Sequence, residues 1–226
     1  RHVLRLTGLE GEAADGRWLA HAYRLFYYDA APSEGISHHP LLNRRIDFGK
    51  SDVAVFRRQL FSALRRQRKF ALRLGHLNQD HDWQIHAKHT KKLLKTRNWA
   101  DHIERTLLEG GESPRLDETQ RRELRDLLAL WRELGEHDVR FGLRQKGVDM
   151  RIGLDIASIT LKRQADTIVL VTGDSDFVPA AKLARREGVE FLIDPLWQKI
   201  GEDLHEHVDG VASGLPRPGT ASEPNT

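Results

Sequence analysis

A run of five uncharged residues, 167–171, leads directly into the acidic segment Thr172-Gly173-Asp174-Ser175-Asp176-Phe177. Apolar residues without polar alternation, bounded by Asp166 and by a Thr-Gly pair, predict a fully buried strand of a parallel sheet. The carboxyl end of this strand presents Asp174 and Asp176 beside a glycine that permits a tight turn. Because ligands bind outside the carboxyl ends of strands in open α/β sheets, this turn is a candidate site.

The two carboxylates of this turn repel each other unless a cation lies between them. Mg²⁺ or Mn²⁺ is the expected ion, because these hard cations prefer oxygen ligands. Such an ion generates hydroxide from water and neutralises the charge that develops on a phosphodiester, so no side-chain nucleophile is required. The structural alternative is that Asp174 or Ser175 only caps the helix that follows.

The flanking residues predict a helix, a strand, the acidic turn, a second helix and a second strand in succession. The first helix is expected to end at about Gln164, and the second spans residues 178–186 before Gly188. Residues 189–193 form the second strand. This order is a parallel crossover unit, and it indicates an α/β fold with a mainly parallel central sheet.

Several motifs of this region resemble the NYN domain, a family of the PIN-like superfamily of metal-dependent nucleases. The matching segments follow one another in the order of the family: Lys146-Gly147-Val148-Asp149, Asp155, residues 172–179 and residues 184–188. A weaker likeness covers residues 25–29 and 70–75, which are similar to the second and third strands of the family. The resemblance implies a three-layer, Rossmannoid PIN-like domain and a divalent-metal-dependent ribonuclease.

One feature of the family is missing from this chain. NYN domains normally open with a strand that ends in a metal-binding aspartate, whereas Arg1-His2-Val3-Leu4 resemble the helix that follows that strand. Either further residues precede Arg1 in the natural protein, or this member has lost a ligand. The resemblance is therefore compatible with an active nuclease and with a catalytically incomplete scaffold.

The upstream acidic residues are expected to complete the site. Asp149 and Asp155 are six residues apart, which places them about 240° apart around a helix axis. They cannot both face one ion from a regular helix, so Asp149 at the helix start is the expected third metal ligand. Its structural alternative is an ordinary amino-terminal cap. Asp155 is expected either beside the metal, as a further catalytic group, or paired with a base, and Lys146 and Ser175 are expected to contact the substrate.

A helix predicted over residues 52–69 has two different faces. Its apolar residues gather on one side: Val53, Phe56, Leu60 and Leu64. The cations are assigned to the opposite half, without carboxylates nearby: Arg57, Arg58, Arg65, Arg66, Arg68 and Lys69. This stripe predicts contacts with RNA phosphates, with a merely solvated face as the alternative.

The remaining segments are assigned to one NYN/PIN-like domain over residues 1–211. Residues 78–138 are expected to form a helical insertion, in which Lys88 and Lys92 are predicted RNA contacts. A second metal site at Asp82, His86 and His89 is disfavoured, because the surrounding lysines oppose a cation. Residues 32–50 predict a long loop, 116–134 an amphipathic helix, and 212–226 a disordered tail.

The composition narrows the classes of function. The 226 residues include no cysteine, which excludes disulfides, thiolate zinc sites and cysteine nucleophiles and fits a reducing cytoplasm. No apolar run is long enough to span a bilayer, so no membrane partner is expected. The net charge is only +3, so binding to a polyanion depends on local clusters of cations.

By its resemblance, the chain is expected to be an endoribonuclease that cleaves single-stranded RNA through metal-activated water. RNA is the expected partner, and a second copy of the chain in a homodimer is a further candidate. Two alternatives stay open, an RNA-binding or regulatory NYN scaffold and a metal-dependent nucleotide phosphohydrolase. A mononucleotide enzyme gains little from a long cationic track, which disfavours the second alternative.

Overall fold

The computed structural model describes residues 18–107, 115–214 and 217. It is a mixed α/β structure with mainly parallel pairing, and it divides into two compact units. The first unit comprises Arg1–Pro32, Asp52–Leu77 and Gln145–Thr226, and the second comprises Ser33–Ser51 and Asn78–Arg144. Residues 1–4 and most of the predicted tail lie outside the described residues. The domain boundaries expected from the sequence stay a prediction.

The first unit contains a sheet with the strand order β1-β4-β5. Its strands are β1 (Leu25–Ala30), β4 (Phe70–Ile85) and β5 (Val139–Lys146), and the last two continue into the second unit. β1 and β4 run parallel, with Leu25 opposite Phe70 and Ala30 opposite Gly75. The two strands proposed by family resemblance are thus present, and β4 is longer than expected.

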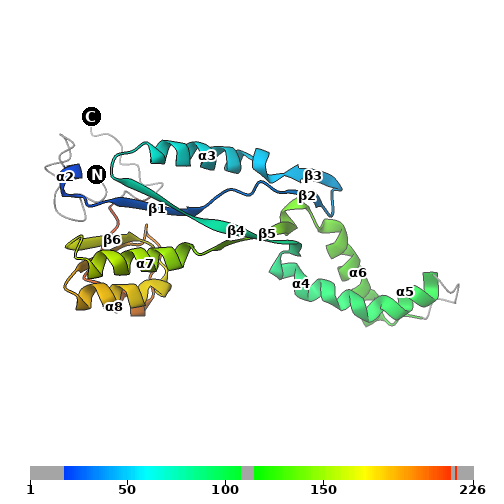
Figure 1. Ribbon diagram of the computed structural model, residues 1–226. Helices are drawn as coiled ribbons and strands as arrows, with labels where there is room; N and C mark the ends of the chain where they lie inside the picture. The colour runs from blue at the N-terminus through cyan, green and yellow to red at the C-terminus, as the bar shows by residue number, and fades with distance from the viewer. Residues whose placement is uncertain (1–17, 108–114, 215–216, 218–226) are drawn as a thin grey trace, which may run out of the picture. The chain divides into compact units, whose positions relative to one another are not determined.

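The predicted crossover unit is confirmed and forms a second sheet of the first unit (Figure 1). Its parallel strands are β6 (Thr167–Val171), β7 (Glu190–Asp194) and β8 (Gly210–Val211). Its helices are α7 (Val148–Leu161), the 3-10 turn η5 (Ser175–Phe177) and α8 (Val178–Arg186). α8 ends before Gly188, whose φ of +81° suits glycine.

The expectation that β6 is fully buried is wrong. Four of its residues are half-buried and Val171 is exposed, because β6 is an edge strand with only β7 beside it among the described residues. β7 occupies the centre and provides the fully buried Phe191 and Ile193. Around them lie the other buried core residues: Ile156, Ala181, Ala184, Val189, Leu204 and Val208.

The start of α7 is fixed by a close approach to β4. A Cβ atom at Gly75 would lie 2.7 Å from the backbone oxygen of Lys146 and 2.8 Å from Cγ2 of Val148. Only glycine therefore fits at this position of β4. Gly147, with φ +76°, then turns the chain from β5 into α7 and places Asp149 in the first helical turn.

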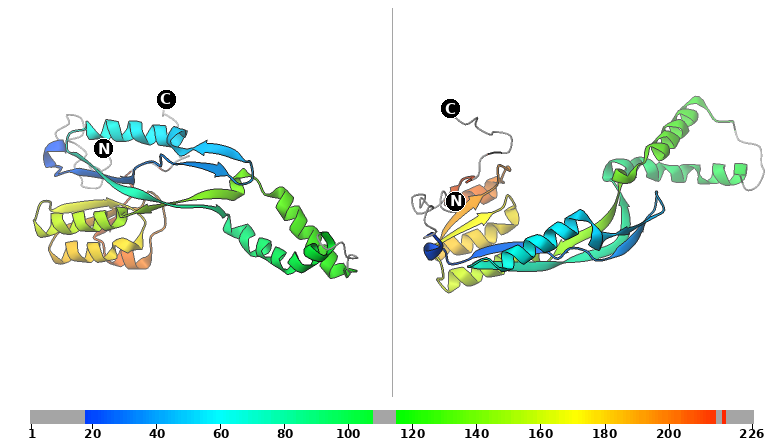
Figure 2. Two further views of the ribbon diagram at one scale, coloured as in Figure 1. Left: turned by 45° about the vertical axis from the view of Figure 1, so that its right-hand side comes forward. Right: turned by 90° about the horizontal axis from the view of Figure 1, so that it is seen from above.

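Helices α3 (Asp52–Arg65) and α7 lie on opposite sides of β1 (Figures 1 and 2). Tyr27 of β1 meets Phe61 of α3, with ring centroids 6.4 Å apart, whereas the next residue, Tyr28, bonds to α7. α3 ends earlier than the expected residue 69. It buries Ala54 and Phe61, while Val53 and Phe56 stay 64% and 62% exposed.

The second unit corrects two predictions. Residues 32–50 are not only a loop, since they contain the antiparallel hairpin of β2 (Ile36–His39) and β3 (Arg44–Asp47) and the turn η2 (Phe48–Lys50). Residues 78–85 belong to β4, so Asp82, His86 and His89 do not share one helix face. The helical interpretation of this part of the insertion is wrong, and with it the spacing argument for a second metal site.

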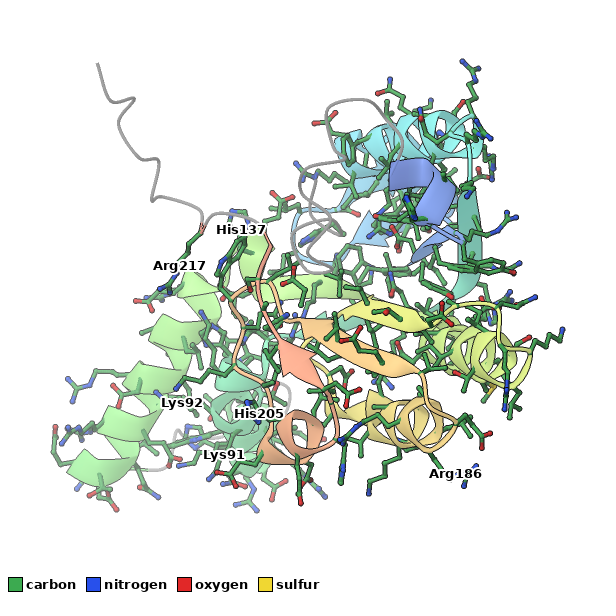
Figure 3. The ribbon with its side chains drawn as sticks, turned by 90° about the vertical axis from the view of Figure 1, so that its left-hand side faces the viewer. Lys91, Lys92, His137, Arg186, His205 and Arg217 are labelled. Atoms are coloured by element: carbon green, nitrogen blue, oxygen red, sulfur yellow. The ribbon has the colours of Figure 1, made fainter. Side chains whose placement is uncertain are left out.

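The helices of the second unit are α4 (Ala87–Leu93), η3 (Leu94–Trp99), α5 (Ala100–Leu107), α6 (Glu118–Glu133) and η4 (Glu136–Asp138). α6 confirms the predicted amphipathic helix and packs against α4. Lys91 and Lys92 are exposed on α4 (Figure 3). Among the described residues, no helix is both long and apolar enough to cross a membrane.

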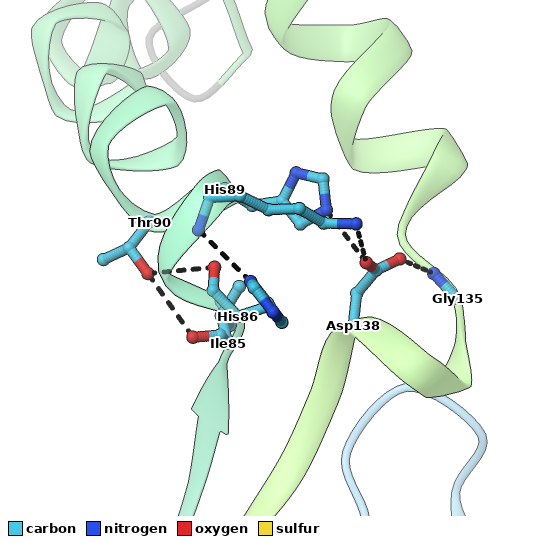
Figure 4. A network of polar contacts seen from close by, with 7 residues as sticks. Ile85, His86, His89, Thr90, Gly135 and Asp138 are labelled. Atoms are coloured by element: carbon cyan, nitrogen blue, oxygen red, sulfur yellow. Dashed lines mark hydrogen bonds and ion pairs between the residues drawn. The ribbon is translucent and has the colours of Figure 1, made fainter. Parts of the chain in front are cut away.

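A polar network joins α4 to η4 within the second unit (Figure 4). Asp138 Oδ1 lies 2.9 Å from His89 Nε2 and 3.2 Å from Lys88 Nζ, and Oδ2 accepts a hydrogen bond of 3.1 Å from Gly135 N. The Gly135 amide, followed by His89 and Lys88, holds the pKa of Asp138 well below its ordinary value.

Asp138→Asn should lower the thermal midpoint at neutral pH, because an amide cannot form these charge-assisted bonds. Since the folded pKa is depressed, the carboxylate stabilises the fold above its unfolded pKa of about 4. That stabilisation is lost as the pH falls from there through the folded pKa. The gap between wild type and variant should therefore shrink as pH is lowered from about 6 to about 3. Asp126→Asn, an exposed residue of α6, is the control, and a gap that stays constant would contradict the role of the network.

Candidate metal and RNA site

The acidic turn leaves β6 at the edge where β6 and β7 end together. Thr172 N donates to Asp194 O at 3.0 Å, which extends the parallel pairing beyond Val171. Asp174 Oδ1 accepts a bond of 2.9 Å from Asp176 N and so caps η5. The structural alternative, a cap, therefore holds for Asp174. It does not compete with metal binding, because a carboxylate has about four lone-pair sites.

The loop after β7 lies against this turn. A Cβ atom at Gly173 would lie 3.1 Å from Gln198 Oε1, and one at Gly201 would lie 2.8 Å from Ser175 Oγ. Gly201 caps α9 (Glu202–Glu206), which contacts η5. The predicted substrate contact Ser175 is exposed at this place, as are Asp174 and Asp176. The loop after β7 and helix α9 thus pack against one side of the turn, and its other side is exposed to solvent.

Lys146 ends β5 and Asp149 lies in the first turn of α7, and both side chains are exposed. α7 contacts η5 within the same unit. In the part of the chain that the structure describes, however, no three Asp, Glu, His or Cys side chains surround a point that suits a metal ion. The structure thus brings together the elements that carry the three aspartates, and not their carboxylates.

The donor chemistry of these aspartates suits Mg²⁺ or Mn²⁺. Asp149, Asp174 and Asp176 supply oxygen ligands only, and none of them forms an ion pair within the described ranges. Exposure leaves the side chains of Asp149 and Asp176 free to rotate toward a cation. The assignment of metal ligands therefore stays a prediction, and the oxygen donors of Asp149, Asp174 and Asp176 favour it.

Asp155 is paired with a base, one of the two roles predicted for it. Its Oδ2 accepts from Tyr28 Oη at 2.9 Å and from Arg73 Nε at 3.1 Å. Burial, followed by the bond and charge of Asp155, raises the pKa of Tyr28. Arg73 also lies over the ring of Phe26, 5.8 Å from its centroid. Asp155 thus joins α7 to β1 and β4.

Two buried carboxylates were not singled out by the sequence. Asp194 ends β7, and its side chain accepts from Leu196 N at 2.8 Å and from Gly214 N at 3.3 Å. Asp29 near the end of β1 accepts through Oδ1 from Ala30 N at 2.8 Å and Gln145 Nε2 at 3.0 Å. In the sequence, each of these two aspartates ends a strongly apolar or aromatic run, and this pattern could have identified them as candidates.

Arg57 does not belong to a cationic stripe remote from carboxylates, and that prediction is wrong for this residue. Its Nη1 lies 3.3 Å from Asp29 Oδ1. Helical spacing explains the error, because Arg57 follows Val53 by four residues and precedes Leu60 by three. These spacings place Arg57 on the side of Val53 and Leu60, from which its guanidinium reaches Asp29 of β1.

The other predicted RNA contacts have different surroundings. Arg58, Arg65, Arg66 and Arg68 are exposed on α3 and just beyond it. Lys69 is turned inward, since its Nζ donates to Ala22 O at 2.5 Å. In the second unit, Lys88 pairs with Asp138, while Lys92 is exposed. The exposed arginines of the first unit are therefore the stronger candidates for phosphate contacts.

Comparison with known families supports the resemblance seen in the sequence. Residues 115–210 match the model of the NYN domain, which belongs to the PIN-like nuclease superfamily. The searches against curated proteins and against solved structures found no match. The matched segment contains Asp149, Asp155, Asp174 and Asp176 and the whole crossover unit. Residues 115–210 of this chain are therefore similar to the NYN domain, a family of the PIN-like nuclease superfamily.

Proposed function

We propose that the protein is a divalent-metal-dependent endoribonuclease of three-layer PIN-like architecture that cleaves single-stranded RNA. The observation that carries this proposal is the NYN match, which includes Asp149, Asp174 and Asp176, all exposed and without ion-pair partners in the described ranges. Two of them, Asp174 and Asp176, follow the carboxyl end of a parallel strand. Ligands of open α/β sheets bind at such ends.

Asp149, Asp174 and Asp176 would hold Mg²⁺ or Mn²⁺, which supplies an activated water and neutralises charge on the phosphate. The cap bond to Asp176 N orients the Asp174 carboxylate, so this ligand is partly preorganised. Lys146 and Ser175, both exposed, would contact the phosphate that is cleaved. Asp155 holds α7 in position through Tyr28 and Arg73 rather than acting on the substrate.

One observation favours the alternative of an RNA-binding scaffold without catalysis. Among the described residues, no three potential metal ligands lie close enough to hold an ion together. The nucleotide phosphohydrolase, the homodimer and the cytoplasmic location have no comparable support and stay predictions. Cleavage activity is the property that separates the nuclease from the scaffold.

Asp174→Asn and Asp149→Asn should each reduce Mn²⁺-dependent cleavage of labelled, unstructured RNA by at least about a hundredfold, because each removes a charged ligand. Asparagine caps helices as well as aspartate does, so Asp174→Asn should keep the fold. The matched control is Asp166→Asn, which changes an exposed aspartate at the amino end of the same strand. EDTA should abolish the wild-type activity. If wild type cleaves RNA no faster than Asp174→Asn but still binds it, the nuclease proposal is refuted and the RNA-binding scaffold is favoured.

Joint replacement of Arg65, Arg66 and Arg68 by Gln should weaken binding to all RNA sequences alike. The slope of log affinity against log salt should fall by up to about 2, since each phosphate contact on a single strand contributes about 0.7. Arg57 is left unchanged because it pairs with Asp29. Lys182 and Arg186, exposed cations of α8, are replaced in the control. A slope that falls equally in the control would refute a specific role for the α3 arginines.

Asp155→Asn should reduce the free energy of unfolding by about 1 kcal/mol, because it removes the ion pair with Arg73 and weakens the bond from Tyr28. Urea denaturation measures this loss. The upward shift of the thermal midpoint on adding Mn²⁺ should be the same as in wild type. A variant that loses the Mn²⁺ shift but keeps its stability would instead identify Asp155 as a metal ligand.

A further inference from the structure

The first unit contains a hollow of about 500 Å³ between β1 and the first turns of α3. It is lined chiefly by Tyr27 and Asp29 of β1 and by Asp52, Val53, Phe56 and Arg57 of α3. Ligand pockets for small planar groups have volumes of this order. None of these residues except Arg57 was assigned a role in RNA binding above, so the hollow requires its own explanation.

The apolar wall of the hollow is exposed to solvent. Val53 and Phe56 are 64% and 62% exposed, although they are apolar side chains on adjoining turns of one helix. Tyr27 is held in place by its contact with Phe61. An exposed Phe ring in a concave site offers a flat surface on which a planar group can stack.

The polar groups of the hollow favour a ligand that donates hydrogen bonds. Asp29 and Asp52 contribute two carboxylates, and Arg57 is the single cation, 3.3 Å from Asp29. Burial and the neighbouring Asp29 raise the pKa of Tyr27, so its hydroxyl stays protonated beside that carboxylate. The resulting formal charge is negative, which disfavours a phosphate and favours a neutral planar group with N–H donors.

The hollow is connected to the start of α7 through Asp29. Gln145 Nε2 donates to Asp29 Oδ1 at 3.0 Å, and Gln145 precedes Lys146 directly and Asp149 by four residues. The polar lining of the hollow is thus bonded to the residue that directly precedes Lys146, the proposed phosphate contact.

We propose that this hollow binds a nucleobase of single-stranded RNA and selects bases that carry an exocyclic amino group. The inference rests on the proposed function, since it takes RNA as the substrate. Phe56 stacks on the base, and the exposed Asp52 accepts hydrogen bonds from the amino group. Cytosine, adenine and guanine carry an exocyclic amino group, whereas uracil lacks it.

The test is fluorescence anisotropy with short labelled oligo(C), oligo(A) and oligo(U) in EDTA, which prevents cleavage. Wild type should bind oligo(C) and oligo(A) more tightly than oligo(U). Phe56→Leu, which keeps the apolar character and removes the ring, should weaken binding to all three by about tenfold. Asp52→Asn should remove the preference and leave binding to oligo(U) unchanged. Val55→Ala is the control, because Val55 is exposed on α3 and does not line the hollow.

Three results would overturn the proposal, and they separate it from the proposed function. Equal affinity for the three oligonucleotides, unchanged by Phe56→Leu and Asp52→Asn, removes the base site and leaves RNA binding intact. Failure to bind any RNA removes both proposals. Phe56-dependent binding of an arginine-rich peptide, with RNA affinity independent of Phe56, would assign the hollow to a cationic protein segment. If the wild type selects bases but does not cleave RNA in Mn²⁺, the base site is supported and only the nuclease proposal is refuted.

Discussion

The parallel pairing of β6 with β7 determines where the acidic turn of the first unit lies. Burial of Phe191 and Ile193 holds β7 in the core, and its register with β6 sets Val171 opposite Asp194. The carboxyl ends of both strands therefore meet at one edge, from which the turn leaves. Loss of core packing around β7 would displace the candidate ligands even though none of them belongs to the core.

The carboxylates of the first unit have two different roles. Asp29, Asp155 and Asp194 accept several internal hydrogen bonds and hold strands, helices and loops together. The three proposed ligands, Asp149, Asp174 and Asp176, are exposed and lack ion pairs in the described ranges. Charge left uncompensated by the protein is what a divalent ion requires, whereas the first group is already satisfied.

Local sequence signals predicted the crossover unit well, and long-range contacts explain most of the failures. The uncharged run of β6, the proline in the first turn of α8 and Gly188 are all local. The β2–β3 hairpin instead depends on His39, which accepts from Leu41 N and packs against Trp83, 44 residues away in the chain. The side-chain partners of Asp29 and Asp155 also lie far away in the chain, so sequence spacing could not predict them. The position of Arg57 beside Val53 and Leu60 on α3, in contrast, follows from helical spacing.

We expect the segment of residues 115–210 to bind a divalent ion through the acidic turn. Isothermal titration calorimetry with Mn²⁺ tests it without any assumption about RNA. Wild type and Asp166→Asn should bind Mn²⁺ with the same saturable affinity, and Asp174→Asn should bind at least about tenfold more weakly, since a charged ligand is lost. The same affinity in Asp174→Asn as in wild type would contradict the assignment of the metal site.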